Sequence, residues 1–244
     1  MSEFETARRS EGVTPSTIRR DLACLSSMFA SAIEWEWVDA NPVPAFLKRR
    51  SKRGLKEGNK RTRYLTPAEE ARLLEHASDG PREAMAMSID TGLRQAEIFS
   101  LQWSQVDVAG GTITTTTMTK SGRARHVPLP ERSRTILGTL PRHPGCPYVL
   151  WNPDTGTRYV HMIKGLKAAA RRAGIKNLRW HDLRRTAGCR WLQRDRRSIE
   201  EVSVLLGHSS IKVTEDAYAF LEAEAVAKSV SGRTKAGTGT TDVL

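Results

Sequence analysis

A run of basic residues divides the chain. Residues 48–63, KRRSKRGLKEGNKRTR, carry nine lysines and arginines against one acid, Glu57. Charges of one sign at this density stay solvated, so the run cannot join a hydrophobic core. Because it lies between two segments with helical periodicity and not at an end, it predicts a linker. The expected organisation is a domain at 1–47, a linker at 48–63, a second domain at 64–230 and a disordered tail at 231–244.

The segment before the basic run predicts an amphipathic helix over 14–34. Thr14 is a favoured N-cap residue, and Pro15 suits the first helical position. Apolar residues recur at intervals of three and four, which places them on one face. The expected buried face consists of Ile18, Leu22, Leu25, Phe29 and Ile33, with Arg19 and Arg20 off that face.

The segment after the run combines helical patterns with one β-hairpin. Thr66 with Glu69, and Ser198 with Glu201, form capping boxes that predict helix starts. Between 103 and 130 the period changes, and residues rich in Thr, Val and Ile flank a Lys-Ser-Gly turn. The predicted fold class is mainly α with a small antiparallel β-sheet (α+β). Expected helices run from Thr66 through Leu74, from Pro81 to near Gly92, over 159–173, 181–194 and 198–206, and from about Thr214 onward.

The charge balance favours a polyanionic partner. Thirty-nine lysines and arginines against 27 acids give a net charge of +12 and an isoelectric point near 10.1. A merely solubilising surface rarely runs so far to one sign, so nucleic acid is favoured over a membrane. Aromatic residues are 6% of the chain and form no exposed boxes of the kind that bind RNA, which favours DNA.

The cysteines point to a reducing compartment. Cys24, Cys146 and Cys189 are odd in number and far apart, and they match neither a disulfide framework nor a metal-ligand spacing. No stretch resembles a signal peptide or an apolar run of membrane-spanning length. The chain is expected to be cytoplasmic, associated with the nucleoid of a bacterium, and to use no metal and no cofactor.

Several polar residues stand where each has an ordinary structural explanation. An Arg and Glu at i,i+3 is most often a surface ion pair, and a His and Arg at that spacing share a helix face by chance in many proteins. A lysine at a hairpin tip is usually solvated, and a histidine after a helix-ending glycine suits the helix C-terminus. A tyrosine in an amphipathic helix usually packs in a core. These residues are, in that order, Arg94 with Glu97, His181 with Arg184, Lys120, His208 and Tyr218.

Their order and context are far more specific. The stretches TGLRQAEI, TKSGRARHVPL, HDLRRT and LLGHSSI, followed by a tyrosine, resemble the boxes of the tyrosine recombinases (phage integrase family), in that family's order across 64–221. Residues 14–43 resemble the closing part of its helical core-binding domain. The resemblance therefore implies a tyrosine recombinase catalytic domain preceded by a truncated core-binding domain. Carried over, the two family arginines fall on Arg94 and Arg184, the lysine on Lys120, the histidines on His181 and His208 and the nucleophile on Tyr218, with Glu97 supporting Arg94.

The implied activity is that of a site-specific recombinase or integrase of a mobile element, which cleaves and rejoins DNA through a 3′-phosphotyrosyl intermediate without metal or ATP. Guanidiniums suit the charge that develops on phosphate oxygens, and a phenol forms a covalent ester that a DNA hydroxyl can reverse. The resemblance assigns a phosphate hydrogen bond to His208, the general base to His181 and the general acid to Lys120. Adjacent cations are expected to lower the pKa of Tyr218 from its ordinary value near 10.

Two features depart from the family pattern. Tyr218 lies ten residues after His208, one later than in many members, and the segment before the linker holds only the last part of the usual helical domain. The implied partners are double-stranded DNA attachment sites and, in the DNA synapse, three further copies in a homotetramer. Type IB topoisomerases share the chemistry, but the LLGHSSI box favours a recombinase. The other alternative is a catalytically silent DNA-binding relic of a truncated prophage integrase. Phosphate contacts are expected from Arg19, Arg20, Lys48, Arg49, Arg50, Lys52 and Arg53.

Overall fold

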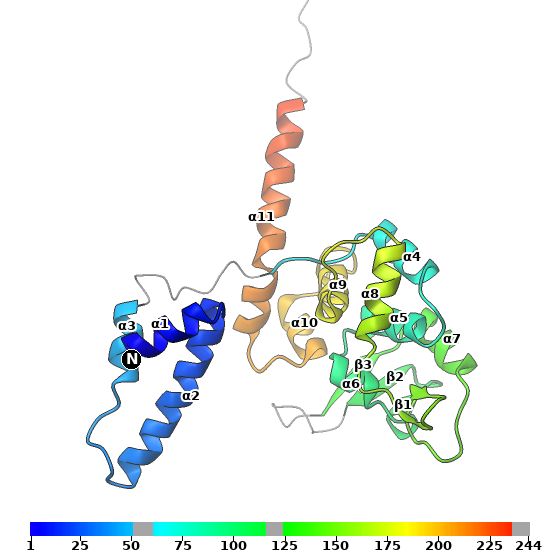
Figure 1. Cartoon of the computed structure of the whole chain (residues 1–244). Helices are drawn as coiled ribbons and strands as arrows, with labels where there is room; N and C mark the ends of the chain where they lie inside the picture. Colours follow the sequence, from blue (N-terminus) through cyan, green and yellow to red (C-terminus); the bar gives the residue numbers. More distant parts are fainter. Residues whose placement is uncertain (51–60, 116–123, 236–244) are drawn as a thin grey trace, which may run out of the picture. The chain divides into compact units, whose positions relative to one another are not determined.

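The computed structural model describes residues 1–50, 61–115 and 124–235, with the backbone alone at 50 and 224–235. It divides into two compact units, Met1–Arg61 and Thr62–Leu244 (Figure 1). Lys52 and Arg53 of the basic run, and Lys120 at the expected hairpin tip, lie outside the described residues. Across the described residues, none of the helices combines the length and apolar character needed to cross a bilayer.

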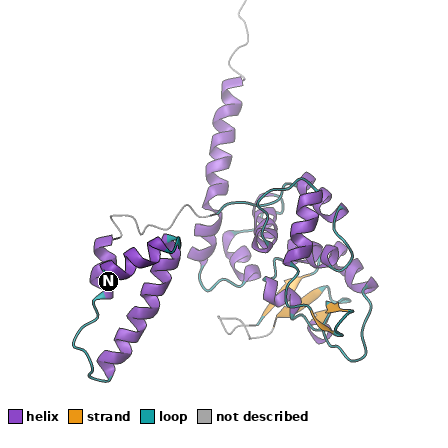
Figure 2. Ribbon diagram, in the orientation of Figure 1, coloured by secondary structure: helices purple, strands orange, loops and turns teal. Residues whose placement is uncertain are grey.

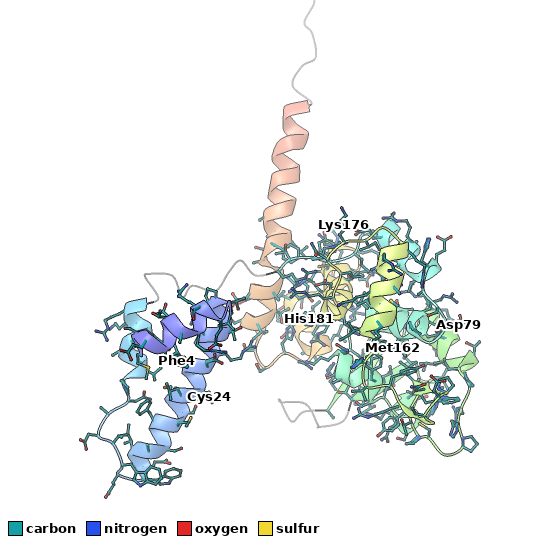
Figure 3. The ribbon with its side chains drawn as sticks, in the orientation of Figure 1. Phe4, Cys24, Asp79, Met162, Lys176 and His181 are labelled. Carbon is teal, nitrogen blue, oxygen red and sulfur yellow. The ribbon has the colours of Figure 1, made fainter. Side chains whose placement is uncertain are left out.

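The first unit is helical. It contains α1 (Ser2–Ser10), α2 (Pro15–Glu34) and α3 (Val43–Arg50). The start of α2 confirms the prediction, because the Thr14 hydroxyl accepts a hydrogen bond from the Thr17 N–H and Pro15 occupies the first turn. Figure 3 shows Phe4 on α1 and Cys24 on α2. The core of this unit is formed by Ile18, Leu22, Val43 and Phe46.

Two expectations for this segment are wrong. Ile33 was expected on the buried face of α2, but it is 39% exposed, because the core of this unit gathers around the earlier turns of the helix. The linker was expected to begin at Lys48, but α3 continues to Arg50. At the start of α3 the Asn41 side chain accepts a hydrogen bond from the Val43 N–H at 3.0 Å. The buried Phe46 packs this helix into the core of the unit.

The second unit is built around α5 (Pro81–Thr91), whose residues 84–91 are all buried. This helix packs against α4, α6, α7, α8 and α9. Leucines, isoleucines, methionines and alanines of these helices form its largest core, to which Phe99 and Trp180 contribute a tilted aromatic pair with ring centroids 5.0 Å apart. The helices of this unit are α4 (Pro67–Glu75), α5, α6 (Gln95–Phe99), α7 (Glu131–Thr139), α8 (Ile163–Arg172), α9 (Trp180–Gln193), α10 (Ile199–Leu206) and α11 (Ile211–Lys235).

Local backbone chemistry decides several of these boundaries as the sequence predicts. Both capping boxes form: the Thr66 hydroxyl accepts from the Glu69 N–H at 3.2 Å, and the Ser198 hydroxyl accepts from the Glu201 N–H at 3.2 Å. The helix ends at Gly92 and Gly207 are also confirmed. Both glycines are left-handed, with φ of 60° and 63°, a conformation that other residues reach only with strain.

The predicted hairpin forms within a three-stranded antiparallel sheet (Figure 2). Its strands are β1 (Val106–Asp107), β2 (Thr112–Thr115) and β3 (Arg125–Pro128). Ile113 pairs with Val127 and both are fully buried, while Thr115 pairs with Arg125. A separate pair, β4 (Trp151–Asn152) and β5 (Thr157–Arg158), was not predicted.

Helix predictions fail where the local signals are weak. Helix α7 was missed, since its sequence ERSRTILGT contains Thr, Ser and Gly, which favour other structures. Helix α8 begins at Ile163 instead of 159, because Thr157 and Arg158 pair in a strand. Helix α11 begins at Ile211, three residues before Thr214, and it continues to Lys235. The expected disordered tail from 231 is therefore wrong for 231–235, since a formed helix propagates more readily than a new one starts.

Candidate active site

Arg94 stands where the chain leaves α5 and enters α6. Gly92 turns the backbone out of α5, and Arg94 becomes the N-cap residue of α6. Its backbone N–H donates to Glu97 Oε2 at 2.7 Å and its Nη1 donates to Glu97 Oε1 at 3.0 Å. Its Nη2 donates to the Gly207 carbonyl at 2.7 Å, at the end of α10. The predicted support of Arg94 by Glu97 thus exists in the geometry, and the side chain stays 37% exposed.

Arg125 is a member of this cluster that sequence reasoning missed. It comes from β3, and its two terminal nitrogens donate to the two oxygens of Glu97 at 2.9 and 2.8 Å. Its Nε donates to the Leu205 carbonyl at 2.9 Å. The side chain is only 7% exposed. The sequence holds a weak signal for this role. Side chains along β3 alternate between the buried and the exposed face, and Arg125 occupies a buried position.

Arg184 is buried within α9 and joins two helix ends. Its Nη1 donates to the Gly92 carbonyl at 2.6 Å, and its Nη2 donates to the Leu206 carbonyl at 2.5 Å. The last carbonyls of a helix have no partner within the helix and carry partial negative charge. Three consecutive carbonyls at the end of α10, on Leu205, Leu206 and Gly207, therefore each accept from a different arginine.

The cluster carries excess positive charge. Glu97 is the carboxylate that Arg94 and Arg125 share, and Arg184 pairs with carbonyls alone in the contacts above. Burial raises the pKa of Glu97, but the hydrogen bonds and charges of Arg125 and then Arg94 outweigh it and lower that pKa to about 2. Burial, followed by the charge of Arg94, lowers the pKa of Arg184 to about 9, which leaves it charged at neutral pH. Such a site suits an anion.

Replacing Glu97 by Gln is expected to lower the free energy of unfolding by about 3 kcal/mol at pH 7, the equivalent of the fall in its pKa. The carboxyl group has a lower pKa in the folded protein, so its stabilisation exists above about pH 4.5 and disappears as the pH falls towards about 2. Urea unfolding at pH 7 and pH 3 measures this. The exposed Glu131, in Glu131→Gln, serves as the control. If the free energy of unfolding differed between the wild type and Glu97→Gln by the same amount at both pH values, the charge of Glu97 would not be the cause.

The two histidines differ in setting. His181 lies in the first turn of α9 and is labelled in Figure 3. Although the residue is exposed to solvent in part, loss of solvation at its ring, followed by the charges of Arg184 and Arg185, lowers its pKa below 6.5. Burial, then Arg184 and Arg94, lowers the pKa of His208 to about 4. The Nδ1 of His208 is hydrogen-bonded to the hydroxyl of the buried Thr214 at 2.7 Å. Both rings are therefore neutral at pH 7.

Tyr218 is buried. It lies on α11, is 5% exposed and packs in a cluster with Ala187, Trp191 and Leu206. Its phenol faces Gly188 of α9. Burial is the main cause of a pKa raised above the ordinary value, and the charges of Arg184 and Arg185 offset it only in part. The expectation that cations lower this pKa is wrong for this conformation, because loss of solvation outweighs them.

The structure thus brings together Arg94, Glu97, Arg184 and His208 from three segments of the second unit and adds Arg125 and Thr214 to them. Arg19, Arg20, Lys48 and Arg49 are exposed on α2 and α3 of the first unit. The side chain of Arg50 is not described. Within the described residues, no group of three or more His, Cys, Asp or Glu is placed to hold a metal ion.

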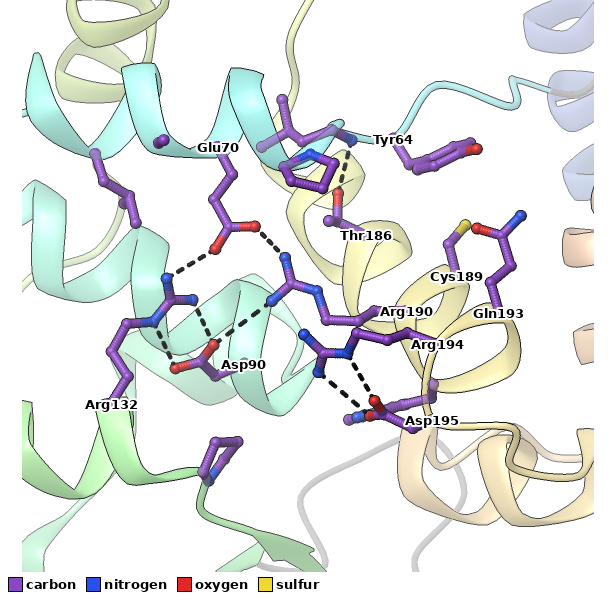
Figure 4. A pocket seen from close by; sticks show the side chains of 16 residues that line it. Tyr64, Glu70, Asp90, Arg132, Thr186, Cys189, Arg190, Gln193, Arg194 and Asp195 are labelled. Carbon is purple, nitrogen blue, oxygen red and sulfur yellow. Dashed lines mark hydrogen bonds and ion pairs between the residues drawn. The ribbon is translucent and has the colours of Figure 1, made fainter.

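The opposite face of α9 borders a cavity of about 620 Å³ (Figure 4). Buried Glu70 and Asp90 meet Arg132 and Arg190 there: Arg132 donates to Glu70 at 2.7 Å and to Asp90 at 3.0 Å, and Arg190 contacts Glu70. The charges of the two carboxylates and the two guanidiniums balance, so the network has no net charge to attract a further ion. It connects α4, α5, α7 and α9. It holds α9 with Arg184 turned towards the cluster described above.

Comparison with known proteins identifies the family of this chain. The model of the phage integrase family matches residues 63–224. The shufflon-specific DNA recombinase of Escherichia coli is 30% identical over 214 residues, which cover 84% of this chain and 51% of that protein. The chain thus spans about half the length of that relative.

Solved structures share the fold. The Tn1549 transposon integrase in complex with a circular intermediate DNA has a TM-score of 0.73 at 20% identity, covering 92% of this chain and 82% of that one. A lambda integrase tetramer bound to a Holliday junction has a TM-score of 0.63 at 19% identity, covering 80% and 59%. The arginine cluster and the three-stranded sheet both lie within the residues that the family model matches. The chain belongs to the phage integrase family.

Proposed function

We propose that the chain is a site-specific DNA recombinase that cleaves and rejoins DNA through a 3′-phosphotyrosyl intermediate, without metal or ATP. The observation that carries this proposal is the gathering of Arg94, Arg184 and Arg125 on the last carbonyls of α10, with one carboxylate between them. This arrangement leaves excess positive charge at fixed positions, which is what stabilises a phosphodiester as negative charge builds on its oxygens.

In the proposed mechanism, Arg94 and Arg184 bind the two non-bridging oxygens of the scissile phosphate. Glu97 and Arg125 hold Arg94 in place through the shared carboxylate. His208 adds a hydrogen bond from its Nε2–H to the phosphate, because the Thr214 hydroxyl can donate to Nδ1 and so select that tautomer. These contacts need no movement of charge at the moment of reaction.

The covalent step exchanges one phosphate ester for another. The Tyr218 oxygen attacks phosphorus, the new P–O(Tyr) bond forms, and the bond from phosphorus to the DNA 5′ oxygen breaks. His181 accepts the phenolic proton, and Lys120 donates a proton to the departing 5′ oxygen. Attack by a 5′ hydroxyl of a partner strand reverses the step and rejoins DNA. No oxidant, reductant or nucleotide is consumed.

The proposed partners are double-stranded DNA attachment sites and three further copies of the chain in the synapse. The lambda integrase tetramer on a Holliday junction supports such an assembly by its similar fold. The exposed cations Arg19, Arg20, Lys48 and Arg49, with Arg50, Lys52 and Arg53, are proposed phosphate contacts. The site of action would be the bacterial nucleoid in the cytoplasm.

A covalent adduct tests the proposal. The purified chain is incubated with chelator and a nicked suicide duplex that carries the attachment site, and a denaturing gel then separates the protein–DNA adduct. Trypsin cuts after Lys212 and Lys228, so mass spectrometry should find the nucleotide on peptide 213–228. Binding without an adduct would favour the silent DNA-binding relic. Relaxation of supercoiled DNA without strand exchange would favour a topoisomerase.

The pH dependence of adduct formation tests the proposed role of His181 as the general base. Because the pKa of His181 lies below 6.5, the rate of adduct formation is expected to be constant from about pH 7 to 8 and to fall as His181 becomes protonated below its pKa. His181→Asn is expected to react slowly at every pH and to lose this fall. If the rate of adduct formation by His181→Asn still fell at low pH, that fall would belong to another group.

A further inference from the structure

Arg185 follows Arg184 in α9, but its side chain is held differently. The terminal nitrogens of Arg184 donate to two helix-end carbonyls. Arg185 forms no hydrogen bond and no ion pair with any residue that the structure describes, and its Nη1 is buried. A buried donor of this kind has given up its hydrogen bonds to water and gained none within the protein, which destabilises the fold. The contacts within the described protein thus give no reason for an arginine at this position.

Helix geometry places Arg185 beside the proposed base and nucleophile. His181 and Gly188 lie seven residues apart on α9, nearly on one line, and the phenol of Tyr218 faces Gly188. At about 100° per residue, Arg184 lies about 60° to one side of His181 and Arg185 about 40° to the other. After loss of solvation, the charges of Arg184 and Arg185 contribute most to the lowered pKa of His181, and both oppose the burial that raises the pKa of Tyr218. The two guanidiniums therefore flank the reacting groups.

The two arginines are placed for different phosphates. An α-helix with its side chains is about 10 to 12 Å across, so two side chains about 100° apart end roughly 8 Å from each other. The oxygens of one phosphate lie much closer together than that. Successive phosphates of one DNA strand are separated by about 3.4 Å along the duplex axis, and by more in space because the strand winds around it. Arg185 is half-buried and so is accessible in part, which leaves it able to meet such a neighbour.

We propose that Arg185 binds the phosphate adjacent to the scissile phosphate in the cleaved strand, and so fixes the scissile phosphate opposite Tyr218. This inference rests on the proposed function, in which Arg184 binds the scissile phosphate itself. Oxygens of the adjacent phosphate supply the acceptors that the described protein does not, and guanidinium–phosphate hydrogen bonds are among the strong ones. Contacts to the DNA backbone set the register of a duplex on a protein.

Thermal unfolding of the DNA-free protein tests the premise. Arg185→Met keeps an unbranched apolar stem but removes the charge. The unfolding temperature is expected to stay the same or to rise, because the substitution breaks no hydrogen bond or ion pair described here and removes a buried donor without a partner. Arg184→Met, which leaves two carbonyls without their donors, should lower it. A comparable fall in Arg185→Met would give Arg185 a structural role and overturn the proposal.

A cycle between protein and DNA locates the contact. One phosphate at a time in the nicked duplex is replaced by a neutral methylphosphonate, and the Kd is measured for the wild type and for Arg185→Met. At one of the two phosphates that adjoin the scissile one, the replacement is expected to weaken wild-type binding about tenfold. It should have little further effect on Arg185→Met, because both changes remove the same contact. Additive effects at both neighbours, or coupling at the scissile phosphate instead, would overturn the proposal.

The salt dependence of binding gives an independent readout with a matched control. Arg185→Met is expected to reduce the slope of log affinity against log salt concentration by about 0.9, the value for one lost phosphate contact. Arg194 ends α9 on the opposite side of the helix, is 68% exposed and pairs with Asp195. Arg194→Met removes the same charge and should leave the slope unchanged. A wild-type slope in Arg185→Met would contradict the contact.

Binding measurements separate this inference from the proposed function. They need no cleavage, so coupling between Arg185 and an adjacent phosphate can be found even when no adduct forms and the proposed function has failed. An adduct formed by the wild type without that coupling would overturn the role of Arg185 alone.

Discussion

Tyr218→Phe is expected to abolish formation of the covalent adduct, a loss of at least about 1,000-fold in rate, because the phenyl ring has no oxygen to attack phosphorus. DNA affinity should stay within about twofold of the wild type, since the phosphate contacts that dominate affinity come from arginines and lysines. The measurement is the single-turnover rate on the nicked suicide duplex, with a binding titration alongside.

The structure predicts that Tyr218→Phe removes the hydroxyl group with little effect on the fold. Tyr218 packs mainly against apolar side chains of its cluster, so removal of the hydroxyl leaves that packing intact. The unfolding temperature should therefore barely change. Tyr159→Phe, which alters a half-buried tyrosine packed against the main core, is the matched control and should cleave normally. A Tyr218→Phe protein that still forms the adduct would place the nucleophile elsewhere.

Arg184→Lys is expected to reduce the cleavage rate by about 100-fold to 1,000-fold, the usual effect of losing one preorganised contact in the transition state. Lysine keeps the charge, but a single ammonium group cannot reproduce the planar fork that donates to the Gly92 and Leu206 carbonyls while facing a phosphate. A loss confined to the rate, with DNA binding retained, would identify geometry as the cause.

Arg184→Ala should add a loss of stability to the loss of rate. Two buried carbonyls at the ends of α5 and α10 would lose their donors, at about 1 to 3 kcal/mol each. Thermal unfolding of both Arg184 variants separates the two effects. Arg171→Ala removes one exposed charge from the last turn of α8 and serves as the control for net charge. A rate within threefold of the wild type in Arg184→Lys would remove Arg184 from the catalytic proposal.

The end of α10 explains why these effects should be strong and localised. Three arginines from β3, α9 and the start of α6 converge on three consecutive carbonyls there. Each guanidinium satisfies a helix-end carbonyl that would otherwise need water. Arg94 and Arg125 share the one carboxylate of Glu97, so the cluster keeps a net positive charge. The same contacts that stabilise the fold therefore orient the cations for a phosphate.

Several parts of the molecule follow from the sequence by itself. The capping boxes at Thr66 and Ser198 and the left-handed glycines at Gly92 and Gly207 were predictable, because each depends on residues within one helical turn. The hairpin followed from its change of period. The family boxes named the residue types of the candidate site. Signals failed where propensities were mixed, as in α7, or where distant pairing decided, as at the start of α8.

Tertiary structure alone decided how the site is held. The bond from Arg94 to Gly207 spans 113 positions and that from Arg184 to Gly92 spans 92, and no local pattern reports contacts over such separations. Arg125 gained its role in the same way. The burial of Tyr218 over Gly188 reversed the expected direction of its pKa, because the solvation of a side chain depends on what the whole fold packs around it, whereas a helix cap depends only on its nearest neighbours along the chain.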